Sequence, residues 1–177
     1  MPKLSFWFVT NKNQRRYGAA VLAGICGGSV ASFVKWGTEL TFPPRVAGRA
    51  VPPAEMLSDW GFAVQNMTYT FSEHVLNWGI SGVHYAFSIA FALFYCVVAE
   101  VLPAIKIWQG IAFGLLITLL FHGALLPTFD WAPPIWLLPI DELLSETFGH
   151  VIWIWTIEVF RRDLRNRWTK VPDAEIT

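Results

Sequence analysis

The residues of this sequence best suited to carry out chemistry are ionisable side chains inside long apolar stretches. A charged group at the centre of a bilayer costs roughly 2.5–3.5 kcal/mol, so such residues usually face a protein interior and often mark function. The candidates are Lys35, Glu39, His84, Glu100, His122, Glu146, His150 and Glu158, with His74 just before the second apolar stretch. Histidine has an unperturbed pKa of about 6.5, so modest acidification changes its charge. The set therefore predicts a place where protons are sensed or carried.

Four-residue spacings place several of these side chains on a shared helix face. Glu146 precedes His150 by four residues, so the two side chains can touch. Lys35 precedes Glu39 by the same step, and a purely structural ion pair is the alternative there. Glu158 precedes Arg162 by four residues, which predicts a salt bridge at the inner interface.

Glu100 has no basic residue within four positions, and we expect it to be the exit of a polar path. On a straight helix, His84 and Glu100 would point in directions about 160° apart around the helix axis, so the two cannot share one face. They must serve a winding pathway or separate sites. The alternative for each histidine is a neutral hydrogen bond between helices.

Metal and enzyme chemistry have weak support. His84, His122, Glu146 and His150 are zinc ligand types, but neither an HExxH nor a CxxC spacing is present. No GxSxG, P-loop or dinucleotide-binding glycine motif occurs either. The two cysteines exclude a disulfide scaffold and a cysteine-rich zinc module. We therefore expect no metal, no other cofactor and no enzyme.

The composition shows what kind of element positions these residues. The 177 residues are 54% hydrophobic and 15% charged, whereas a typical soluble domain is about 25% charged. The formal net charge is zero, which argues against a nucleic-acid partner. The sequence therefore predicts a single domain embedded in a lipid bilayer.

Four stretches are long enough to cross a bilayer as helices, at residues 17–38, 76–102, 107–126 and 143–160. Backbone polar groups cannot stay unpaired in hydrocarbon, so helices are required. Prolines 103 and 127 are expected to end the second and third stretches, and Asp141 to cap the fourth. The predicted fold is an all-α polytopic membrane protein with four transmembrane helices.

Lysine and arginine orient the four predicted spans. Ten of the thirteen lie before the first span, between the second and third, or after the fourth, in the tail at residues 161–177. Positive residues favour the cytoplasm, so both termini are expected there. All four histidines then fall in the outer half of the membrane or at its outer edge. The outer loop at residues 39–75 contains a stretch from Pro53 to Trp60 that predicts a short interfacial helix or lid.

Small residues at four-residue steps predict close helix packing. Ala20, Gly24, Gly28 and Ser32 form one ridge on the first span, and Ala23, Gly27 and Ala31 form a second. The third span carries Gly110 and Gly114. Part of the first span's small surface is a candidate subunit interface, which these residues alone do not decide.

Several local motifs, spread over nearly the whole chain, resemble one known family. They are Arg15-Arg16-Tyr17-Gly18, Phe33-Val34-Lys35-Trp36-Gly37, Pro43-Pro44-Arg45, His74-Val75 with Asn77-Trp78, FYCVVAEVLP at 94–103, Trp108-Gln109-Gly110, Phe148-Gly149-His150 and IEVFRRDLRNR at 157–167. The chain resembles the YagU-like family of small bacterial inner-membrane proteins. Its outer loop is shorter than the family's, which weakens any inference about that loop.

The resemblance implies an inner-membrane protein linked to survival at low pH and forming a homodimer. It carries over Lys35, Glu39, His74, His84, Glu100, His122, Glu146, His150 and Glu158 as family features without a catalytic role.

Together, the residues and the resemblance favour a pH-responsive pathway for protons or small ions. In this hypothesis His84, Glu100, His122, Glu146 and His150 form the pathway, and Lys35, Glu39, His74 and Glu158 are supporting charges. The alternatives are a non-conducting membrane adaptor or pH sensor and a transporter of small substrates.

Overall fold

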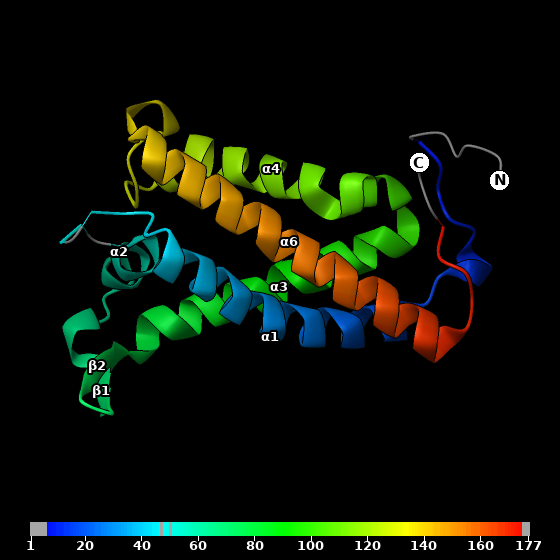
Figure 1. The fold of residues 1–177 in the computed structure, drawn as a ribbon, viewed down its shortest axis with the longest axis horizontal. Coiled ribbons are helices and arrows are strands. Elements are labelled where there is room, and N and C mark those ends of the chain that lie inside the picture. Colours follow the sequence, from blue (N-terminus) through cyan, green and yellow to red (C-terminus); the bar gives the residue numbers. More distant parts are fainter. Residues whose placement is uncertain (1–6, 47, 50, 175–177) are drawn as a thin grey trace.

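Four long helical segments build most of the molecule in the computed structural model, which describes residues 7–46, 48–49 and 51–174. They are α1 (Tyr17–Thr41), α3 (Trp78–Val101), a composite segment described below, and α6 (Ile140–Thr169). The segments lie along the long axis of the molecule, and α1 begins near the point where α6 ends (Figure 1). We call this the inner end and the opposite one the outer end.

The composite segment begins with a 3-10 turn (Pro103–Gly110), continues through α4 (Ile111–Leu120) and a π-helical turn (Phe121–Leu125), and ends with α5 (Leu126–Thr128). The expectation of a continuous helix from residue 107 was wrong. Trp108 and Gln109 have φ values of 53° and 56°, in the left-handed region, so the chain turns sharply before α4 begins.

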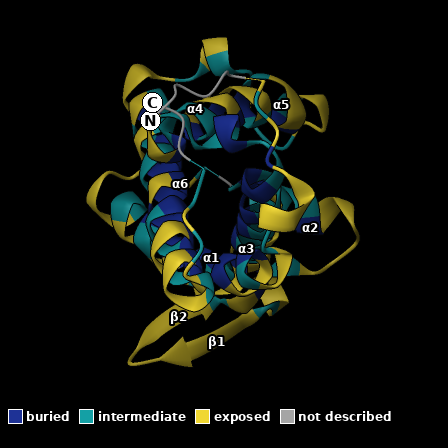
Figure 2. Cartoon of the chain, turned by 90° about the vertical axis from the view of Figure 1, so that its right-hand side faces the viewer, coloured by how far each residue is buried: buried dark blue, intermediate teal, exposed yellow. Residues whose placement is uncertain are grey.

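Two short elements lie in the predicted outer loop. A helix, α2 (Pro52–Asp59), begins with two prolines, which suit the first turn because they lack an N–H that would find no partner. An antiparallel hairpin follows, formed by β1 (Thr68–Phe71) and β2 (His74–Asn77), with Phe71 opposite His74. The hairpin is exposed (Figure 2) and departs from the predicted all-helical fold. Further 3-10 turns lie at Lys12–Gln14, Val64–Asn66 and Ile135–Leu137.

Three segments of the described chain are long and apolar enough to cross a membrane: Tyr17–Thr41, Trp78–Val101 and Pro103–Thr128. Their apolar side chains point outwards as well as inwards, and Leu116 and Leu119 of α4 are 56% and 60% exposed. Water-soluble proteins rarely expose large contiguous apolar patches. The fourth predicted span lies within α6, which is not among the three.

α1 packs between α3 and α6, and α4 packs on α6. A side chain at Gly28 would place its Cβ 2.8 Å from Ala92 Cβ of α3, and one at Gly27 would lie 3.1 Å from Phe160 Cβ of α6. Both small-residue ridges of α1 are buried, as Figure 2 shows for the inward faces of the helices. The candidate subunit interface on this ridge is therefore covered by the chain's own helices.

The remaining predicted packing glycines also lie at close contacts. A Cβ at Gly24 would lie 3.0 Å from Leu93 Cα of α3, and one at Gly114 would lie 3.1 Å from the His150 carbonyl of α6. Gly110 has a φ of 85°, a conformation that suits glycine, and it ends the turn before α4. The expected cap of the last helix was wrong: α6 begins at Ile140 after Pro139, and Asp141 lies in its first turn.

Candidate functional site

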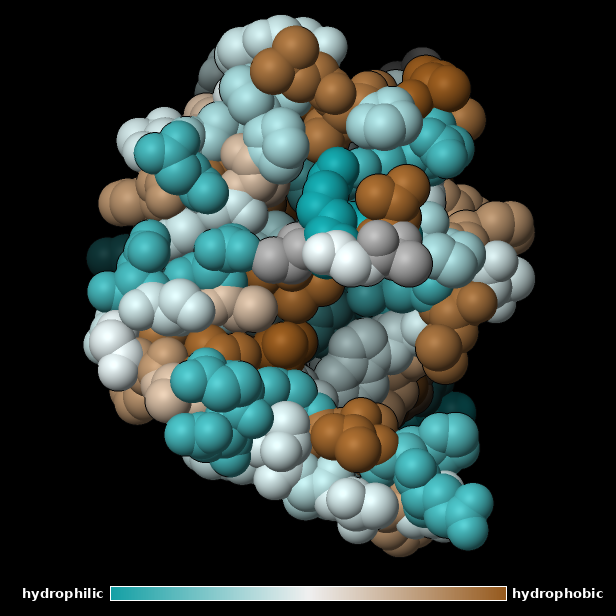
Figure 3. Space-filling view, turned by 90° about the vertical axis from the view of Figure 1, so that its left-hand side faces the viewer, coloured by the Kyte–Doolittle hydropathy of each residue, from teal (hydrophilic) through white to brown (hydrophobic). Residues whose placement is uncertain are grey.

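A cavity of about 410 Å³ lies in the outer half of the bundle. Ile80, Val83 and Phe87 of α3 line it, and Phe121 and Leu125 line it from the π-helical turn. α1, α6 and the segment around α2 complete the lining. Viewed from the outer end, the molecule is hollowed between hydrophilic and hydrophobic residues (Figure 3). Apolar walls with a few convergent polar groups are typical of ligand sites.

Charged and titratable side chains converge on the cavity from five parts of the chain. We call them the outer cluster: Lys35, Glu39, Arg45, His84, His122, Glu146 and His150. Glu146, which is 2% exposed, is at their centre. Lys35 Nζ lies 3.4 Å from Glu146 Oε2, and Arg45 forms an ion pair with the other carboxylate oxygen. Lys35 also pairs with Glu39, so two cations balance two carboxylates.

The histidines differ in how they are held. His150 Nδ1 lies 2.9 Å from the backbone carbonyl oxygen of Glu146 and can donate to it, which leaves Nε2 as the acceptor in the neutral ring. His122 Nε2 lies 3.6 Å from Glu146 Oε2, while its buried Nδ1 has no hydrogen-bond partner among the described residues. His84 stacks on Trp36, with ring centroids 5.4 Å apart. The rings of His122 and His150 are 5.6 Å apart, so protonating one affects the other.

The same residues come close to a metal-binding arrangement. His122, Glu146 and His150 each offer a ligand atom, and these atoms lie within 4.8 Å of one another. However, Lys35 and Arg45 already balance the Glu146 carboxylate. A divalent cation would add positive charge at these buried residues, which is costly unless further anions compensate it. The arrangement therefore favours an ion-pair cluster over a metal centre.

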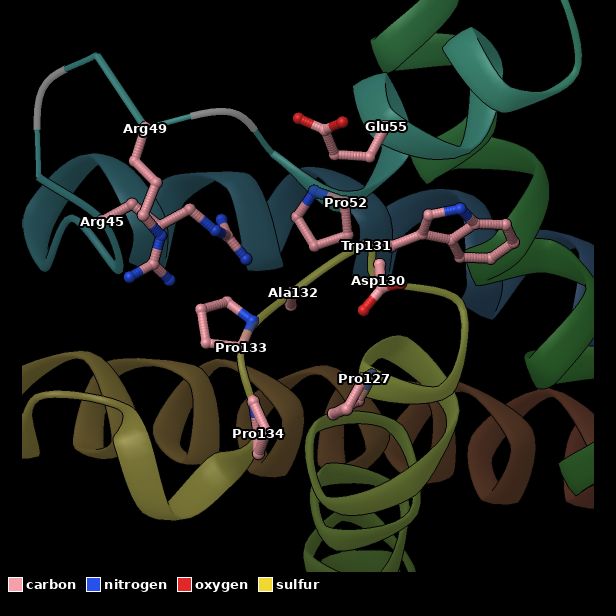
Figure 4. A pocket seen from close by; sticks show the side chains of 10 residues that line it. All are labelled: Arg45, Arg49, Pro52, Glu55, Pro127, Asp130, Trp131, Ala132, Pro133 and Pro134. Carbon is pink, nitrogen blue, oxygen red and sulfur yellow. The ribbon is translucent and has the colours of Figure 1, made fainter.

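A second hollow of about 390 Å³ adjoins the cavity at the outer end and shares Arg45, Pro52 and Trp131 with it. Figure 4 shows Arg45 and Arg49 reaching from the loop after α1 towards a space that Pro133 and Pro134 bound from the opposite side. Arg49 pairs with Glu142 of α6. We call this hollow the mouth, because it adjoins the cavity at the outer end.

On the side of the cavity that faces the inner end, a layer of aromatic side chains fills the space between the helices. Phe87 and Phe91 of α3 contact Phe121 edge to face, with ring centroids 5.1 and 5.4 Å apart, and Trp153 stacks on Phe87. Ser88 Oγ accepts a hydrogen bond of 2.7 Å from Trp153 Nε1 and donates one of 2.7 Å to the Gly28 carbonyl. Tyr95, Cys96, Ile154 and Ile157 continue the buried core towards the inner end.

A second set of charges lies at the inner end, and we call it the inner cluster: Glu100, Lys106, Glu158, Arg161, Arg165 and Asp173. Glu100 accepts from Arg165, with 3.1 Å between Oε2 and one guanidinium nitrogen, and from the backbone N–H of Arg16 at 2.7 Å. Arg161 makes two hydrogen bonds to Glu158, of 2.6 and 2.9 Å.

The tail after α6 folds back onto this cluster. Asp173 pairs with Arg161 and lies 2.9 Å from Lys106 Nζ. Burial alone would raise the pKa of the Asp173 carboxyl, but Arg161 and Lys106 hold that pKa below its usual value of 3.8. The inner cluster thus fixes the tail to α6 and to the turn before α4.

The structure gathers most, but not all, of the predicted site residues. Six of them lie together at the cavity: Lys35, Glu39, His84, His122, Glu146 and His150. Glu100 lies in the inner cluster, away from the cavity, and His74 is exposed on the hairpin. The expected partner of Glu158 was wrong, because Glu158 pairs with Arg161 rather than Arg162.

Arg45 is the main participant that the sequence did not reveal. It lies in a loop, 101 residues before Glu146, and nothing in the local spacing links the two. Its place in the motif Pro43-Pro44-Arg45 was the available signal, since two prolines restrict the loop that presents it.

These features define a helical membrane protein with a charged cavity in one half of its bundle. The chain belongs to the family described as "Protein of unknown function (DUF1440)", which matches residues 29–159. It is similar to the protein named "Inner membrane protein YagU" of Escherichia coli (strain K12), with 44% identity over 193 residues, covering 94% of each chain. No solved structure matches the chain.

Proposed function

We propose that this protein is a pH-responsive pathway for protons or small ions in the bacterial inner membrane and contributes to survival in acid. The observation that carries the proposal is the shared cavity of His84, His122, Glu146 and His150, which opens towards the outer end. Histidine is the side chain whose charge changes under mild acidification. Three histidines beside a buried carboxylate provide groups that take up protons when the outer side is acidified.

The proposal includes α6 as a fourth membrane span. Its buried side chains include the charged residues Glu142, Glu146, Glu158, Arg161 and Arg165. Large apolar residues of the same helix, such as Leu144 and Phe148, are 62% and 44% exposed. Charge that faces the bundle and apolar surface that faces outwards are compatible with lipid, even though the average composition of α6 is not apolar.

The orientation follows from the basic residues. Those of the inner end are Lys12, Arg15, Arg16, Lys106, Arg161, Arg162, Arg165, Arg167 and Lys170, whereas Arg45 and Arg49 are at the outer end. Basic residues favour the cytoplasmic side, so both termini are cytoplasmic in this proposal. The cavity then faces the periplasm, which is the side from which external acid arrives.

Acidification would act through competition for Glu146. With neutral histidines the outer cluster is balanced, since Lys35 and Arg45 offset Glu39 and Glu146. Protonation of His122, which lies 3.6 Å from Glu146, adds a third cation beside the same carboxylate. Arg45 belongs to a loop and can move into water. We therefore expect its ion pair with Glu146 to break first. Release of that loop would widen the mouth.

The inner half must also rearrange before ions can cross. The aromatic layer and the inner cluster both lie between the cavity and the inner end. In this proposal, the cavity is accessible from the outer end in this conformation, and the aromatic layer and the inner cluster block it from the inner end. Glu100 remains the proposed inner exit, reached once its pairing with Arg165 loosens.

Reconstitution into liposomes tests the pathway directly. Acidifying the side that exposes the mouth should produce proton flux, and replacing His84, His122 and His150 by alanine should abolish it. His74→Ala is the matched control, because His74 is exposed on the hairpin outside the cavity. Equal flux in the triple variant and the control would refute the assignment.

The closed aromatic layer favours one second candidate, a non-conducting pH sensor or adaptor. In that case acid would still release the Arg45 loop, but no flux would follow. Sealed liposomes without flux, together with an acid-dependent change in loop accessibility that the triple histidine variant lacks, would favour the sensor. A homo-oligomer remains part of either proposal, and cross-linking in native membranes measures it.

A further inference from the structure

We propose that the cavity binds a small amphipathic organic anion, with one carboxylate on an aromatic or short aliphatic body, and that proton uptake strengthens this binding. The inference deepens the proposed function and rests on it for the protonation of the histidines. It names the class of molecule that the cavity takes when the outer cluster is protonated.

The size and walls of the cavity suit such a molecule. Its volume of about 410 Å³ lies within the usual range of roughly 300–1,000 Å³ for small-molecule sites. Ile80 and Val83 of α3 and Leu125 of the π-helical turn supply apolar lining, and Phe87 and Phe121, which contact each other, add an aromatic part. The charged groups lie mainly on α1, α6 and the Arg45 loop, so a ligand with one apolar and one polar end matches the site.

The hydrogen-bonding capacity of the outer cluster favours an acceptor. Both carboxylates already have cationic partners, Glu39 through Lys35 and Glu146 through Lys35 and Arg45. The buried Nδ1 of His122 has no partner among the described residues. A protonated imidazole donates through both nitrogens and accepts through neither. Proton uptake by His122 therefore makes its Nδ1 a donor that no described group satisfies, and a carboxylate satisfies it.

The charge balance favours the same ligand. The charged and titratable groups around the histidines are Lys35 and Glu39 of α1, Arg45 and Arg49 of the following loop, His84 of α3, His122 of the π-helical turn, and Glu142, Glu146 and His150 of α6. With neutral histidines these cations and carboxylates balance, so each added proton leaves one uncompensated positive charge. An organic anion restores neutrality, whereas an organic cation would have to displace Lys35 or Arg45.

The mouth offers the anion a route. Arg45 and Arg49 reach into it from the loop after α1, and the carboxylates Glu55 and Asp130 also line it (Figure 4), so the mouth carries charges of both signs. Because proton and anion binding each favour the other, the coupling must be reciprocal. The anion should bind more tightly in acid, and its binding should draw protons onto the cluster.

Benzoate, benzamide and benzylamine test the proposal, since they share a ring and differ in charge. Binding to the purified protein in lipid nanodiscs is measured by calorimetry at about pH 5.5 and about pH 7.5, between which histidine titrates and benzoate stays ionised. We expect benzoate to bind about fivefold or more tightly at the lower pH. Benzamide binding as tight as that of benzoate at the lower pH, preferential binding of benzylamine, or pH-independent benzoate binding would each overturn the inference.

Two variants place the ligand in the cavity. Val83→Phe narrows the cavity and should weaken benzoate binding, whereas Val30→Phe makes the same change at an exposed position of α1 and should leave it intact. His122→Gln keeps a similar size and should reduce the pH dependence while retaining weak binding. Equal benzoate binding in the two phenylalanine variants would place the ligand elsewhere and refute the proposal.

The liposome experiment separates this inference from the proposed function. Acid-driven flux in a protein that does not bind benzoate would refute the ligand and retain the pathway. Acid-enhanced benzoate binding without flux in sealed liposomes would support the ligand and refute the pathway.

Discussion

The outer and inner clusters contain similar residue types but differ in how they are enclosed. The outer cluster lines a cavity, includes a loop residue, Arg45, and contains three histidines. The inner cluster is packed without a cavity of its own among those described, and its guanidinium groups at Arg161 and Arg165 are 0% and 2% exposed. Buried charges without room to move are a structural lock, whereas charges beside a cavity can exchange partners. The inner cluster therefore stabilises the fold, whereas the residues of the outer cluster have room to change ion-pair partners.

The largest expected effect comes from breaking the lock. Glu100→Gln leaves the buried guanidinium of Arg165 with only the more distant carboxylate of Asp173, at 3.8 Å, and loss of one partner of a buried pair costs roughly 3–5 kcal/mol of unfolding free energy. Unfolding in mixed detergent micelles measures the loss. As a control, Asp163→Asn breaks an exposed pair, with side chains 51% and 74% exposed, and should cost less than about 1 kcal/mol. Similar losses in both variants would contradict the lock.

The tail contact should show a smaller, pH-dependent effect. Because the pKa of Asp173 is lower in the folded protein than its ordinary value of 3.8, the carboxylate stabilises the fold above that value. The contribution disappears as the pH falls through the lowered folded pKa. Asp173→Asn should therefore cost about 1.5–3 kcal/mol at neutral pH and at pH about 5.5, and nothing in strong acid. A loss that vanishes already at pH about 5.5 would show that the inner end also senses mild acid.

The matched change in the outer cluster should cost less. Glu146→Gln removes the partner of Lys35 and Arg45, but Lys35 keeps Glu39 and Arg45 can return to water with its loop. We expect a loss of about 1–2 kcal/mol at neutral pH. The same micelle unfolding measurement compares it with Glu100→Gln. Equal losses would remove the distinction between the two clusters.

The smallest expected effect is spectroscopic. His84 stacks on Trp36 at 5.4 Å, and a protonated imidazole over an indole ring is a cation–π contact that quenches fluorescence. Tryptophan emission should therefore fall as acidification protonates His84. His84→Gln should reduce the fall, and His74→Gln should leave it unchanged. An undiminished fall in His84→Gln would show that His84 does not take up a proton in this range.

Apolar patterning and the cost of charge in hydrocarbon anticipated the helical fold and the residues that gather at the cavity. Glu146 and His150 were linked by helix spacing, and the small residues of α1 indicated close contacts. Both predictions rest on periodicity, which acts within one helix. They needed no knowledge of which helices are neighbours.

Long-range partners could not be predicted in the same way. Glu100 and Arg165 are separated by 65 residues, so their pairing depends on how α3 and α6 align. The hairpin was missed because its two turn residues, Ser72 and Glu73, have φ values of 46° and 67° without the glycine or asparagine that usually marks such a turn. Glu158 selected Arg161 over Arg162, since Arg161 alone of the two arginines is buried.

The inward-facing charge of α6 has a consequence for biogenesis. A helix that presents carboxylates and guanidiniums on one side is a poor substrate for insertion by itself, because those groups would meet lipid before they meet their partners. We expect the three apolar segments to enter the membrane first and α6 to join them as the closing member of the assembly. A change that removes Lys35 or Glu100 would then reduce the yield of inserted protein, before any mature protein is tested.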